Sequence, residues 1–534
     1  MPEFVLTGGE VVDGTSAPRF AADVVVTDDR ISAIAPPGTL SRAGPVIDVT
    51  GLVVAPGFID MHAHSDLAVL ADPAHEAKVS QGVTCEVLGQ DGLSYAPSTE
   101  ETLPQLQAQL AAWNGTPDLD YSWRSVGEYL DRIDLGSPVN VAYLVPHGNV
   151  RMTVLGTEDR APTEGELQSM QRLVANGLAE GAVGLSAGLT YTPGMYAEDD
   201  ELVRLCAPVA HAGGFYCPHH RNYGSSVLEG YAACLRIARR AEVALHLAHC
   251  HVNFPENAGR AQQLLDMLDT AVVEENLDLS LDSYPYLAGA TYLAALLPSW
   301  AHSGGPERVL ERLHTSESRA RIIHELEVQG TDGNQGMRVD WATVTVSAVS
   351  DPRLNWAVGA SLQELGARYE TPPGQLYCDL LVADHLGSGC LLHVGNEDNV
   401  QTVMRHTAHT GGSDGILVGQ RPHPRGWGTF PRYLGTYVRE LGVFGLEECI
   451  AHLTSRPARR LGLTDRGVLR VGAKADIAVV DPQTVAATAT YAEPRQLPEG
   501  IQHVLVNGVF TVRDRVRTQR VPGHSLRPLN SPGY

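Results

Sequence analysis

The stretch Pro56-Gly57-Phe58-Ile59-Asp60-Met61-His62-Ala63-His64 decides how this 534-residue chain is interpreted. The apolar run at residues 52–55 leads through a Pro-Gly break into a short apolar segment that ends in two histidines. Residues two apart in a strand point to the same face, so His62 and His64 are expected on one side. Two imidazoles at the carboxyl end of a strand provide half of a metal site. The alternative is a pair of solvent-facing histidines on an edge strand.

The composition is that of a compact, loop-rich globular protein, with 43% hydrophobic residues, 54 glycines and 33 prolines. The length exceeds a typical single domain, and a large α/β barrel with a small accessory domain fits it. A formal net charge of −23 disfavours binding to nucleic acid or to an anionic membrane. We therefore expect a small-molecule substrate as the partner, and the sequence leaves open a homo-oligomer.

The eight cysteines are scattered and include no C-x-x-C pair. The first residues do not resemble a signal peptide, and no run approaches the roughly 18 apolar residues of a membrane span. These features favour a reduced, cytoplasmic setting.

The two ends of the chain resemble each other. Residues 3–55 contain short alternating strands separated by turns, and residues 476–481 and 503–510 contain more of the same. This pattern predicts one small β-sandwich domain built from residues 1–57 and 461–534. The alternative is two independent β flaps.

Between these ends, residues 58–460 alternate short apolar segments with amphipathic, helix-like stretches, which predicts a parallel sheet. The expected helices cover residues 163–177, 225–240 and 261–275. About eight strand–helix units predict a closed (β/α)8 TIM-like barrel of the α/β class. A doubly wound open sheet is the runner-up, but no G-x-G-x-x-G follows a strand. Residues 300–395 fit the alternation poorly and are expected to be an insertion between the last strands. The expected strands cover residues 83–88, 139–146, 182–187, 214–219, 243–249, 277–284 and 416–418.

Further polar residues stand at the ends of expected strands. His219 and His249 follow apolar segments, and Asp414 lies in a glycine-rich turn, Gly411-Gly412-Ser413-Asp414-Gly415. Singly, each is explained as a hydrogen-bonded core histidine or a turn-forming aspartate. In a barrel, however, the carboxyl ends of all strands converge on one mouth, where these three residues would meet His62 and His64. Such a set suits Zn²⁺ or a similar divalent ion with one position open for water.

These motifs resemble the amidohydrolase superfamily, and most closely its D-aminoacylases, the N-acyl-D-amino-acid deacylases. The resemblance runs from about residue 5 to about residue 525. It implies a (β/α)8 barrel with a β-sandwich, and hydrolysis of the amide bond of N-acyl-D-amino acids. The motifs that carry it, besides H-x-H, are Ser80-Gln81-Gly82-Val83-Thr84, Gly184-Leu185-Ser186-Ala187-Gly188-Leu189, Tyr284-Pro285-Tyr286, Gly412-Ser413-Asp414-Gly415, the run from Pro422-His423-Pro424-Arg425 to Gly428-Thr429-Phe430-Pro431-Arg432, and Thr454-Ser455-Arg456-Pro457-Ala458.

Relatives such as hydantoinases bridge two metals with a carboxylated lysine on the fourth strand. This chain has only Lys78 and Lys474, neither of them on that strand, so a lysine bridge is excluded. D-aminoacylases typically use a cysteine after strand two, where this chain has Asp91. A carboxylate is a harder ligand than a thiolate, so one or two Zn²⁺ ions are expected with Mn²⁺ or Mg²⁺ as alternatives. The alternatives to ligation by Asp91 are a simple turn residue there and ligation by Cys85.

The resemblance implies that Asp414 moves a proton from the metal-activated water to the leaving nitrogen. For the substrate carboxylate, Arg425 is the first choice, because a guanidinium matches a carboxylate. The competing interpretation of Arg425 is a structural salt bridge. Tyr191 and Tyr284 are expected as hydrogen-bond donors, and His251 stands where relatives often have a lysine.

No Arg or Lys lies between Tyr286 and Trp300, where relatives that prefer acidic substrates place a second cation. We therefore predict a neutral or apolar D-side chain, with the D preference itself resting only on the resemblance. A hydrolase of D-amino-acid-containing dipeptides or of cyclic amides is an alternative that would use the same site. A non-catalytic relative is a second alternative, which the presence of every strand-end histidine and of Asp414 disfavours.

Overall fold

The computed structural model describes residues 4–39 and 44–527. At its centre lies a parallel eight-stranded sheet in the order β16-β12-β11-β10-β9-β8-β7-β6. The sheet closes on itself where Met61 N donates to Gly411 O at 3.1 Å and Asp414 N donates to His62 O at 2.7 Å. The predicted (β/α)8 barrel is therefore confirmed. Its strands are β6 (Phe58–Asp60), β7 (Val83–Leu88), β8 (Asn140–Pro146), β9 (Gly184–Gly188), β10 (Phe215–His219), β11 (Ala244–Leu247), β12 (Leu279–Ser283) and β16 (His409–Gly411).

Helices cover the outside of the barrel, and two of them, α5 (Val126–Asp134) and α7 (Glu164–Ala179), begin with strong local signals. Ser125 and Glu128 form a capping box at the start of α5, and Thr163 and Glu166 form one at the start of α7. The helices expected at 163–177, 225–240 and 261–275 correspond to α7, α9 and α10. The barrel helices include α1 (Ala68–Ala71), α2 (Glu76–Val79), α3 (Thr102–Gln109), α4 (Ala111–Asn114), α5 (Val126–Asp134), α6 (His147–Leu155), α7 (Glu164–Ala179), α8 (Asp199–His211), α9 (Val227–Ala241), α10 (Ala261–Val273), α16 (Glu397–Met404), α17 (Arg425–Arg432), α18 (Leu446–Leu453) and α19 (Ser455–Arg460).

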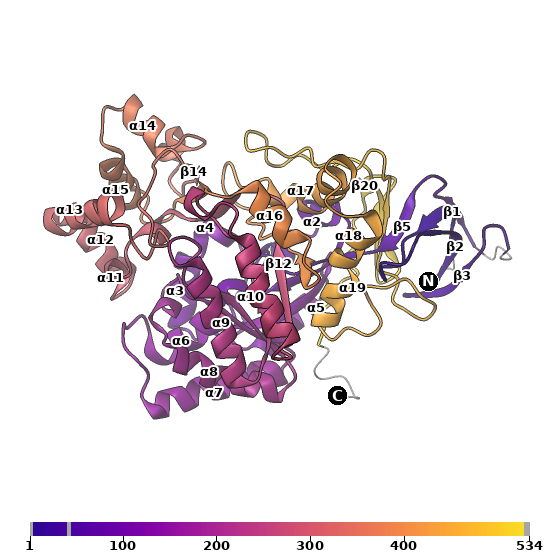
Figure 1. Ribbon diagram of the computed structural model, residues 1–534, viewed down its shortest axis with the longest axis horizontal. Coiled ribbons are helices and arrows are strands. Elements are labelled where there is room, and N and C mark those ends of the chain that lie inside the picture. Colours follow the sequence, from indigo (N-terminus) through magenta and orange to yellow (C-terminus); the bar gives the residue numbers. More distant parts are fainter. Residues whose placement is uncertain (1–3, 40–43, 528–534) are drawn as a thin grey trace.

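Strands from both ends of the chain form one nine-stranded sheet beside the barrel, on the right in Figure 1. The junction lies where β5 pairs antiparallel with β17, with Pro56 opposite Ile477. Two independent β flaps are therefore ruled out, and the expectation of a small sheet domain fed by both termini is confirmed. Its strands are β1 (Phe4–Val11), β2 (Phe20–Thr27), β3 (Arg30–Ala35), β4 (Val46–Asp48), β5 (Val53–Pro56), β17 (Ile477–Val480), β18 (Ile501–Val506), β19 (Val509–Arg513) and β20 (Val516–Arg517).

A long excursion of the chain separates the last two barrel strands, β12 and β16. It contains an antiparallel three-stranded sheet in the order β13-β15-β14 and a group of helices at the upper left of Figure 1. Its strands and helices are β13 (Ala288–Tyr292), α11 (Ser299–His302), α12 (Pro306–His314), α13 (Ser316–His324), β14 (Val344–Ala348), α14 (Leu362–Arg368), α15 (Pro373–Ala383) and β15 (Gly389–His393).

The eighth barrel strand differs from the sequence expectation. A strand was expected at 416–418, after the glycine-rich turn, whereas β16 is a three-residue strand that precedes this turn. The reason is local: Gly412 N still bonds Ser283 O of β12, and Asp414 then adopts a positive φ of 49° that turns the chain away. The apolar residues after Gly415 therefore pack outside the sheet.

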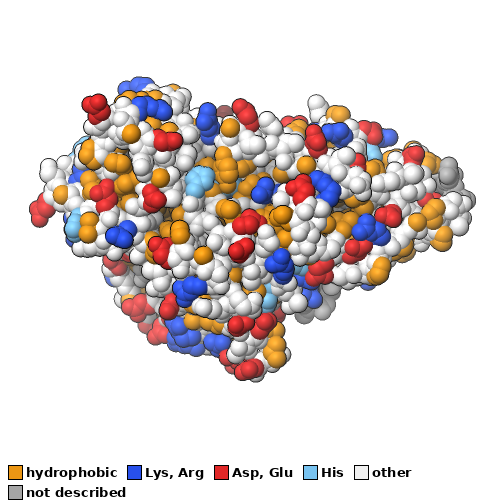
Figure 2. Space-filling view, turned by 45° about the horizontal axis from the view of Figure 1, so that its top comes forward, with side chains coloured by type: hydrophobic (Ala, Val, Ile, Leu, Met, Phe, Trp, Pro, Cys, Tyr) orange, Lys and Arg blue, Asp and Glu red, His pale blue; other side chains and the backbone are white. Residues whose placement is uncertain are grey.

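On the face seen in Figure 2, acidic and basic side chains are scattered among each other, and neither sign forms a large patch. Within residues 4–39 and 44–527, no helix combines the length and apolar character needed to span a membrane.

Candidate metal centre

Six side chains predicted as ligands meet at the carboxyl ends of the barrel strands. Their donor atoms form two groups, and within each group all donor atoms lie within 4.8 Å of one another. Every member is buried. Neither Lys78 nor Lys474 belongs to these groups. The first group is His62, His64, Asp91 and Asp414, and the second is Asp91, His219 and His249.

Asp91 belongs to both groups and lies between them. It occupies a short 3-10 turn after β7 with a positive φ of 54°, a conformation that aspartate tolerates better than most residues. Its Oδ1 lies 3.3 Å from His249 Nε2 and 3.5 Å from His62 Nε2. Its Oδ2 lies 3.5 Å from His219 Nδ1 and 3.6 Å from His64 Nε2. The carboxylate therefore faces four imidazoles at once.

These distances fit a metal ion better than direct hydrogen bonds. Two donor atoms that each lie about 2.1 Å from a tetrahedral ion are roughly 3.4 Å apart. Both ring nitrogens of His62 and Oδ1 of Asp91 are buried without a hydrogen-bond partner among the described residues. Buried polar atoms without partners are rare unless an ion or water binds them. Nitrogen and carboxylate donors suit Zn²⁺ and, because Asp91 replaces a thiolate, Mn²⁺ as well.

Neighbouring side chains hold three of the imidazoles in place. Tyr223 OH lies 3.1 Å from His249 Nδ1, and Thr190 Oγ1 lies 2.8 Å from His219 Nε2. Asp282 Oδ2 lies 3.6 Å from His62 Nδ1, on the side away from Asp91, which is an ion-pair distance and not a hydrogen bond. Such partners fix the ring orientation of metal-binding histidines. The sequence analysis missed all three, although Asp282 was detectable as a carboxylate inside the buried strand β12.

The charges at the site are mutually dependent. Burial disfavours the ionised form of Asp91, yet the surrounding His249, His62 and His219 outweigh it and hold the Asp91 pKa well below its usual value. Burial likewise opposes a charge on His62, but Asp91 and Asp282 raise the His62 pKa well above its usual value. The centre is thus built around an ionised carboxylate, which is the form that binds a metal.

Asp414 and Arg425 form a second charged contact at the mouth. Asp414 Oδ1 lies 3.2 Å from His64 Nε2 and 2.9 Å from Arg425 Nη2. Arg425 begins α17, is fully buried, and places its guanidinium over the Tyr284 ring at 4.4 Å from the centroid. Although burial opposes ionisation, Arg425 and His64 lower the Asp414 pKa below its usual value.

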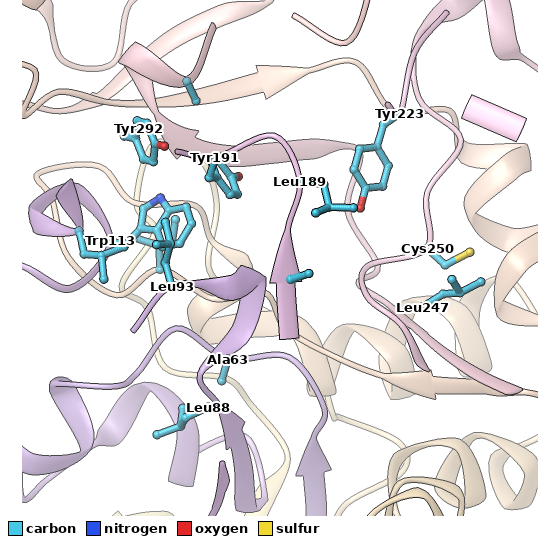
Figure 3. Packing of buried hydrophobic residues seen from close by; sticks show 14 of the residues in the cluster. Ala63, Leu88, Leu93, Trp113, Leu189, Tyr191, Tyr223, Leu247, Cys250 and Tyr292 are labelled. Carbon is cyan, nitrogen blue, oxygen red and sulfur yellow. The ribbon is translucent and has the colours of Figure 1, made fainter. Parts of the chain in front are cut away.

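A cavity opens above the metal-binding groups. Three of the predicted substrate-binding residues, Tyr191, Tyr284 and His251, line it. The fourth, Arg425, lies behind Tyr284 and is not among the lining residues. Figure 3 shows Trp113, Tyr191 and Tyr292 gathered on one side, and Trp113 and Tyr191 meet edge to face at 5.0 Å. The excursion after β12 contributes apolar lining residues such as Ala290 and Leu392. Among the described residues, no lysine or arginine lines this cavity.

Cys85, the alternative ligand, lies inside β7 among the apolar side chains that fill the barrel. Its sulfur is buried, and burial raises the pKa of its thiol, which disfavours the thiolate that a metal needs. The geometry therefore favours Asp91 over Cys85.

Gly188, at the end of β9, allows the loop of Asp91 to approach closely. A Cβ at Gly188 would collide with the Asp91 carbonyl oxygen, which is backbone and cannot swing aside. We expect Gly188→Ala to displace Asp91 and to weaken metal binding about 10- to 100-fold, the loss typical of a displaced ligand environment. Metal titration of the purified variant measures this, with Gly165→Ala on α7 as control because its Cβ would meet open space. Unchanged metal affinity in Gly188→Ala would show that the loop adapts.

A closed parallel barrel with imidazoles and carboxylates converging on its mouth defines the class of metal-dependent barrel hydrolases. The amidohydrolase family model matches residues 45–512. A D-aminoacylase of Alcaligenes xylosoxydans xylosoxydans is 34% identical over 98% of this chain and 97% of its own length. An N-acyl-D-glutamate deacylase of the same organism is 35% identical over 98% of this chain and 96% of its own length.

Among solved structures, N-acyl-D-glutamate deacylase from Bordetella bronchiseptica, complexed with zinc and a phosphonate inhibitor, superimposes with a TM-score of 0.83. It shares 34% identity and covers 98% of this chain and 99% of its own. This chain belongs to the amidohydrolase family, within its D-aminoacylase group.

Proposed function

We propose that the protein hydrolyses the amide bond of N-acyl-D-amino acids with a neutral or apolar side chain, releasing a carboxylate and a free D-amino acid. The observation that supports this most directly is the metal-binding cluster of His62, His64, Asp91, His219, His249 and Asp414 beneath a cavity without cationic lining. The relatives at 34% and 35% identity are named for deacylation of D-amino-acid derivatives. The unpaired cysteines of the described residues also suit the cytoplasm.

The residues of this chain divide the chemistry between them. A divalent ion bound by the cluster would lower the pKa of water from 15.7 to about 7 and polarise the amide carbonyl. Asp414, ionised beside Arg425, accepts the proton that the attacking water loses and delivers it to the leaving amide nitrogen. Thr190, Tyr223 and Asp282 keep the imidazoles oriented while this happens.

The substrate carboxylate has three candidate partners on one side of the cavity. Tyr284 and His251 line the cavity with their rings 4.1 Å apart, and Nε2 of His251 has no hydrogen-bond partner among the described residues. We propose that these two side chains contact the carboxylate directly. Arg425 then supplies positive charge from behind Tyr284 while it pairs with Asp414. Arg425 would thus act both in recognition of the substrate carboxylate and in a structural salt bridge, the two roles considered from the sequence.

The cavity composition leads to a testable substrate preference. An acidic D-side chain would lose its hydration without gaining a cation, at a cost of at least about 1–3 kcal/mol. We expect kcat/KM for N-acetyl-D-leucine to exceed that for N-acetyl-D-glutamate by about 10- to 100-fold or more. N-acetyl-L-leucine, a D-containing dipeptide and a lactam in the same panel test the enantiomer preference and the alternative amides.

A matched variant sharpens this test. Ala290 lies on β13 and lines the cavity, so Ala290→Arg adds the cation that the lining lacks. We expect this variant to narrow or reverse the preference against N-acetyl-D-glutamate. Wild-type activity that is highest on the D-glutamate derivative would contradict the proposed substrate class.

A further inference from the structure

A buried lysine lies directly behind the metal-binding residues. Lys78, on the short helix α2, has a fully buried side chain, and its ammonium group contacts three oxygens. These are Asp60 Oδ2 at 2.6 Å, Ser413 Oγ at 2.8 Å and Glu86 Oε1 at 3.1 Å. The contacts to Asp60 and Ser413 are hydrogen bonds, and the contact to Glu86 is an ion pair.

Asp60 connects this lysine to two metal-binding segments. Its Oδ1 accepts hydrogen bonds from His62 N at 3.2 Å and from Ser413 N at 2.7 Å. The first segment contains His62 and His64, and the second continues into Asp414. Direct hydrogen bonds between the two segments, such as Asp414 N to His62 O at 2.7 Å and Ser413 Oγ to His62 O at 3.3 Å, set their pairing. Because Lys78 holds Oδ2 of the same Asp60 carboxylate, this buried ion pair adds a further constraint on their spacing.

The turn that follows α2 also contacts α17, the helix that carries Arg425. Gln81, three residues after Lys78, donates from Nε2 to Gly426 O at 2.8 Å and accepts from Phe430 N at 3.2 Å. Both contacts lie on α17. The segment from Lys78 to Gln81 therefore touches the H-x-H segment, the loop of Asp414 and the helix of its ion-pair partner.

We propose that Lys78 and Asp60 are positioning residues that set the metal position formed by His62, His64 and Asp414, separately from the position formed by His219 and His249. This proposal rests on the metal centre described above. The described contacts of Lys78 and of the Asp60 carboxylate lie on the side of β6, β7 and the loop after β16. None of these contacts reaches His219 or His249, so the effect of the pair is confined to one of two positions that share Asp91.

The charge around Lys78 explains why a lysine is needed there. Asp60 and Glu86 are both fully buried, and Glu86 is held in addition by Ser65 Oγ at 2.8 Å and by His75 Nε2 at 2.6 Å. Burial opposes the ionised form of Glu86, but Lys78 and His75 lower its pKa to about 2. Removal of Lys78 alone leaves two buried carboxylates near each other without their shared cation, which destabilises the fold as well as the site.

The test therefore uses a pair of variants and measures metal binding rather than hydrolysis. The metal-free full-length protein is titrated with Zn²⁺ against a chelator of known affinity, for wild type, Lys78→Met and Lys78→Met/Asp60→Asn. Asparagine keeps an oxygen for His62 N and Ser413 N, and the double variant removes both charges together. His64→Ala marks the loss of the first position, and Lys474→Met, the other lysine of the chain, is the control for loss of an ion pair elsewhere.

We expect wild type to show two classes of zinc site, and both Lys78 variants to lose about 10- to 100-fold in affinity in the class that His64→Ala abolishes. The other class keeps its affinity, and the double variant regains thermal stability without regaining the lost class. Two intact classes in the double variant, or an equal loss in both, would overturn the proposal. A single class in wild type would overturn it too, since the proposal requires two positions. Deacylase activity is assayed separately. If the protein does not hydrolyse the proposed substrate, the zinc titration still tests the role of Lys78 and Asp60.

Discussion

Replacement of Asp414 by asparagine is expected to lower kcat by about 10²- to 10⁴-fold, the contribution typical of a positioned acid–base group. Asparagine keeps the shape of the side chain and one oxygen towards His64 and Arg425, but it cannot accept the proton of the attacking water. Steady-state kinetics with N-acetyl-D-leucine and metal analysis of the same preparation measure the effect. We expect metal content to fall less than kcat, because the ligands other than Asp414 remain.

Asp266→Asn provides the matched control, since Asp266 is an exposed aspartate on α10 that belongs neither to the cluster nor to the cavity lining. Its kinetics should equal those of wild type. An Asp414→Asn variant that retains both its metal and wild-type kcat would remove Asp414 from the proton transfer and require another base at the mouth.

Replacement of Asp91 by asparagine is expected to have the second large effect, on the metal itself. The Asp91 carboxylate faces four imidazoles, and its charge is what balances them. We expect affinity for Zn²⁺ to fall by at least about 100-fold. Loss of a residue that only orients a metal ligand costs up to about 100-fold, and loss of a ligand itself should cost at least as much. Asparagine is preferred to alanine here because the positive φ of Asp91 would add roughly 1–2 kcal/mol of backbone strain to most residues.

Asp91→Cys tests how the type of ligand atom at this position determines which metal is preferred. It restores the ligand type of the resembling D-aminoacylases, and a thiolate favours zinc over manganese more strongly than a carboxylate does. We expect the zinc-to-manganese affinity ratio to rise by about tenfold or more from wild type to Asp91→Cys. Unchanged metal content in Asp91→Asn would reduce Asp91 to a turn residue before Gly92.

The sequence predicted the parts of the site that depend on strand ends. His62, His64, His219 and His249 follow apolar strands directly, and parallel strands place their carboxyl ends together whatever the loops do. Asp91 was recognised only because a family motif has a cysteine there. That its carboxylate lies between both groups depends on a left-handed turn after β7, which no hydrophobic periodicity signals.

Other parts could not be predicted for physical reasons. The strand β16 has only three residues, too few to show a period, and the apolar run at 416–418 was more conspicuous although it packs outside the sheet. Arg425 was placed at the cavity by its chemistry, but packing against Tyr284 determines that it lies behind the wall. Lys78 and Asp60 were visible as charged residues in apolar surroundings, yet their partnership joins residues that only the closed barrel brings together.

The sheet shared by both termini has a consequence for how the protein is made. Pro56 pairs with Ile477, so the first strands leave the ribosome long before their partners exist. At about 5–20 residues per second, roughly 20–80 s of translation separate the two halves of that edge. During this interval β5 exposes an unpaired edge next to the first barrel strand, where a chaperone or another nascent chain can bind. The shared sheet of this hydrolase is therefore completed only after Ile477 and the residues that follow it have been made. Slower translation of the C-terminal region should increase aggregation of the nascent chain.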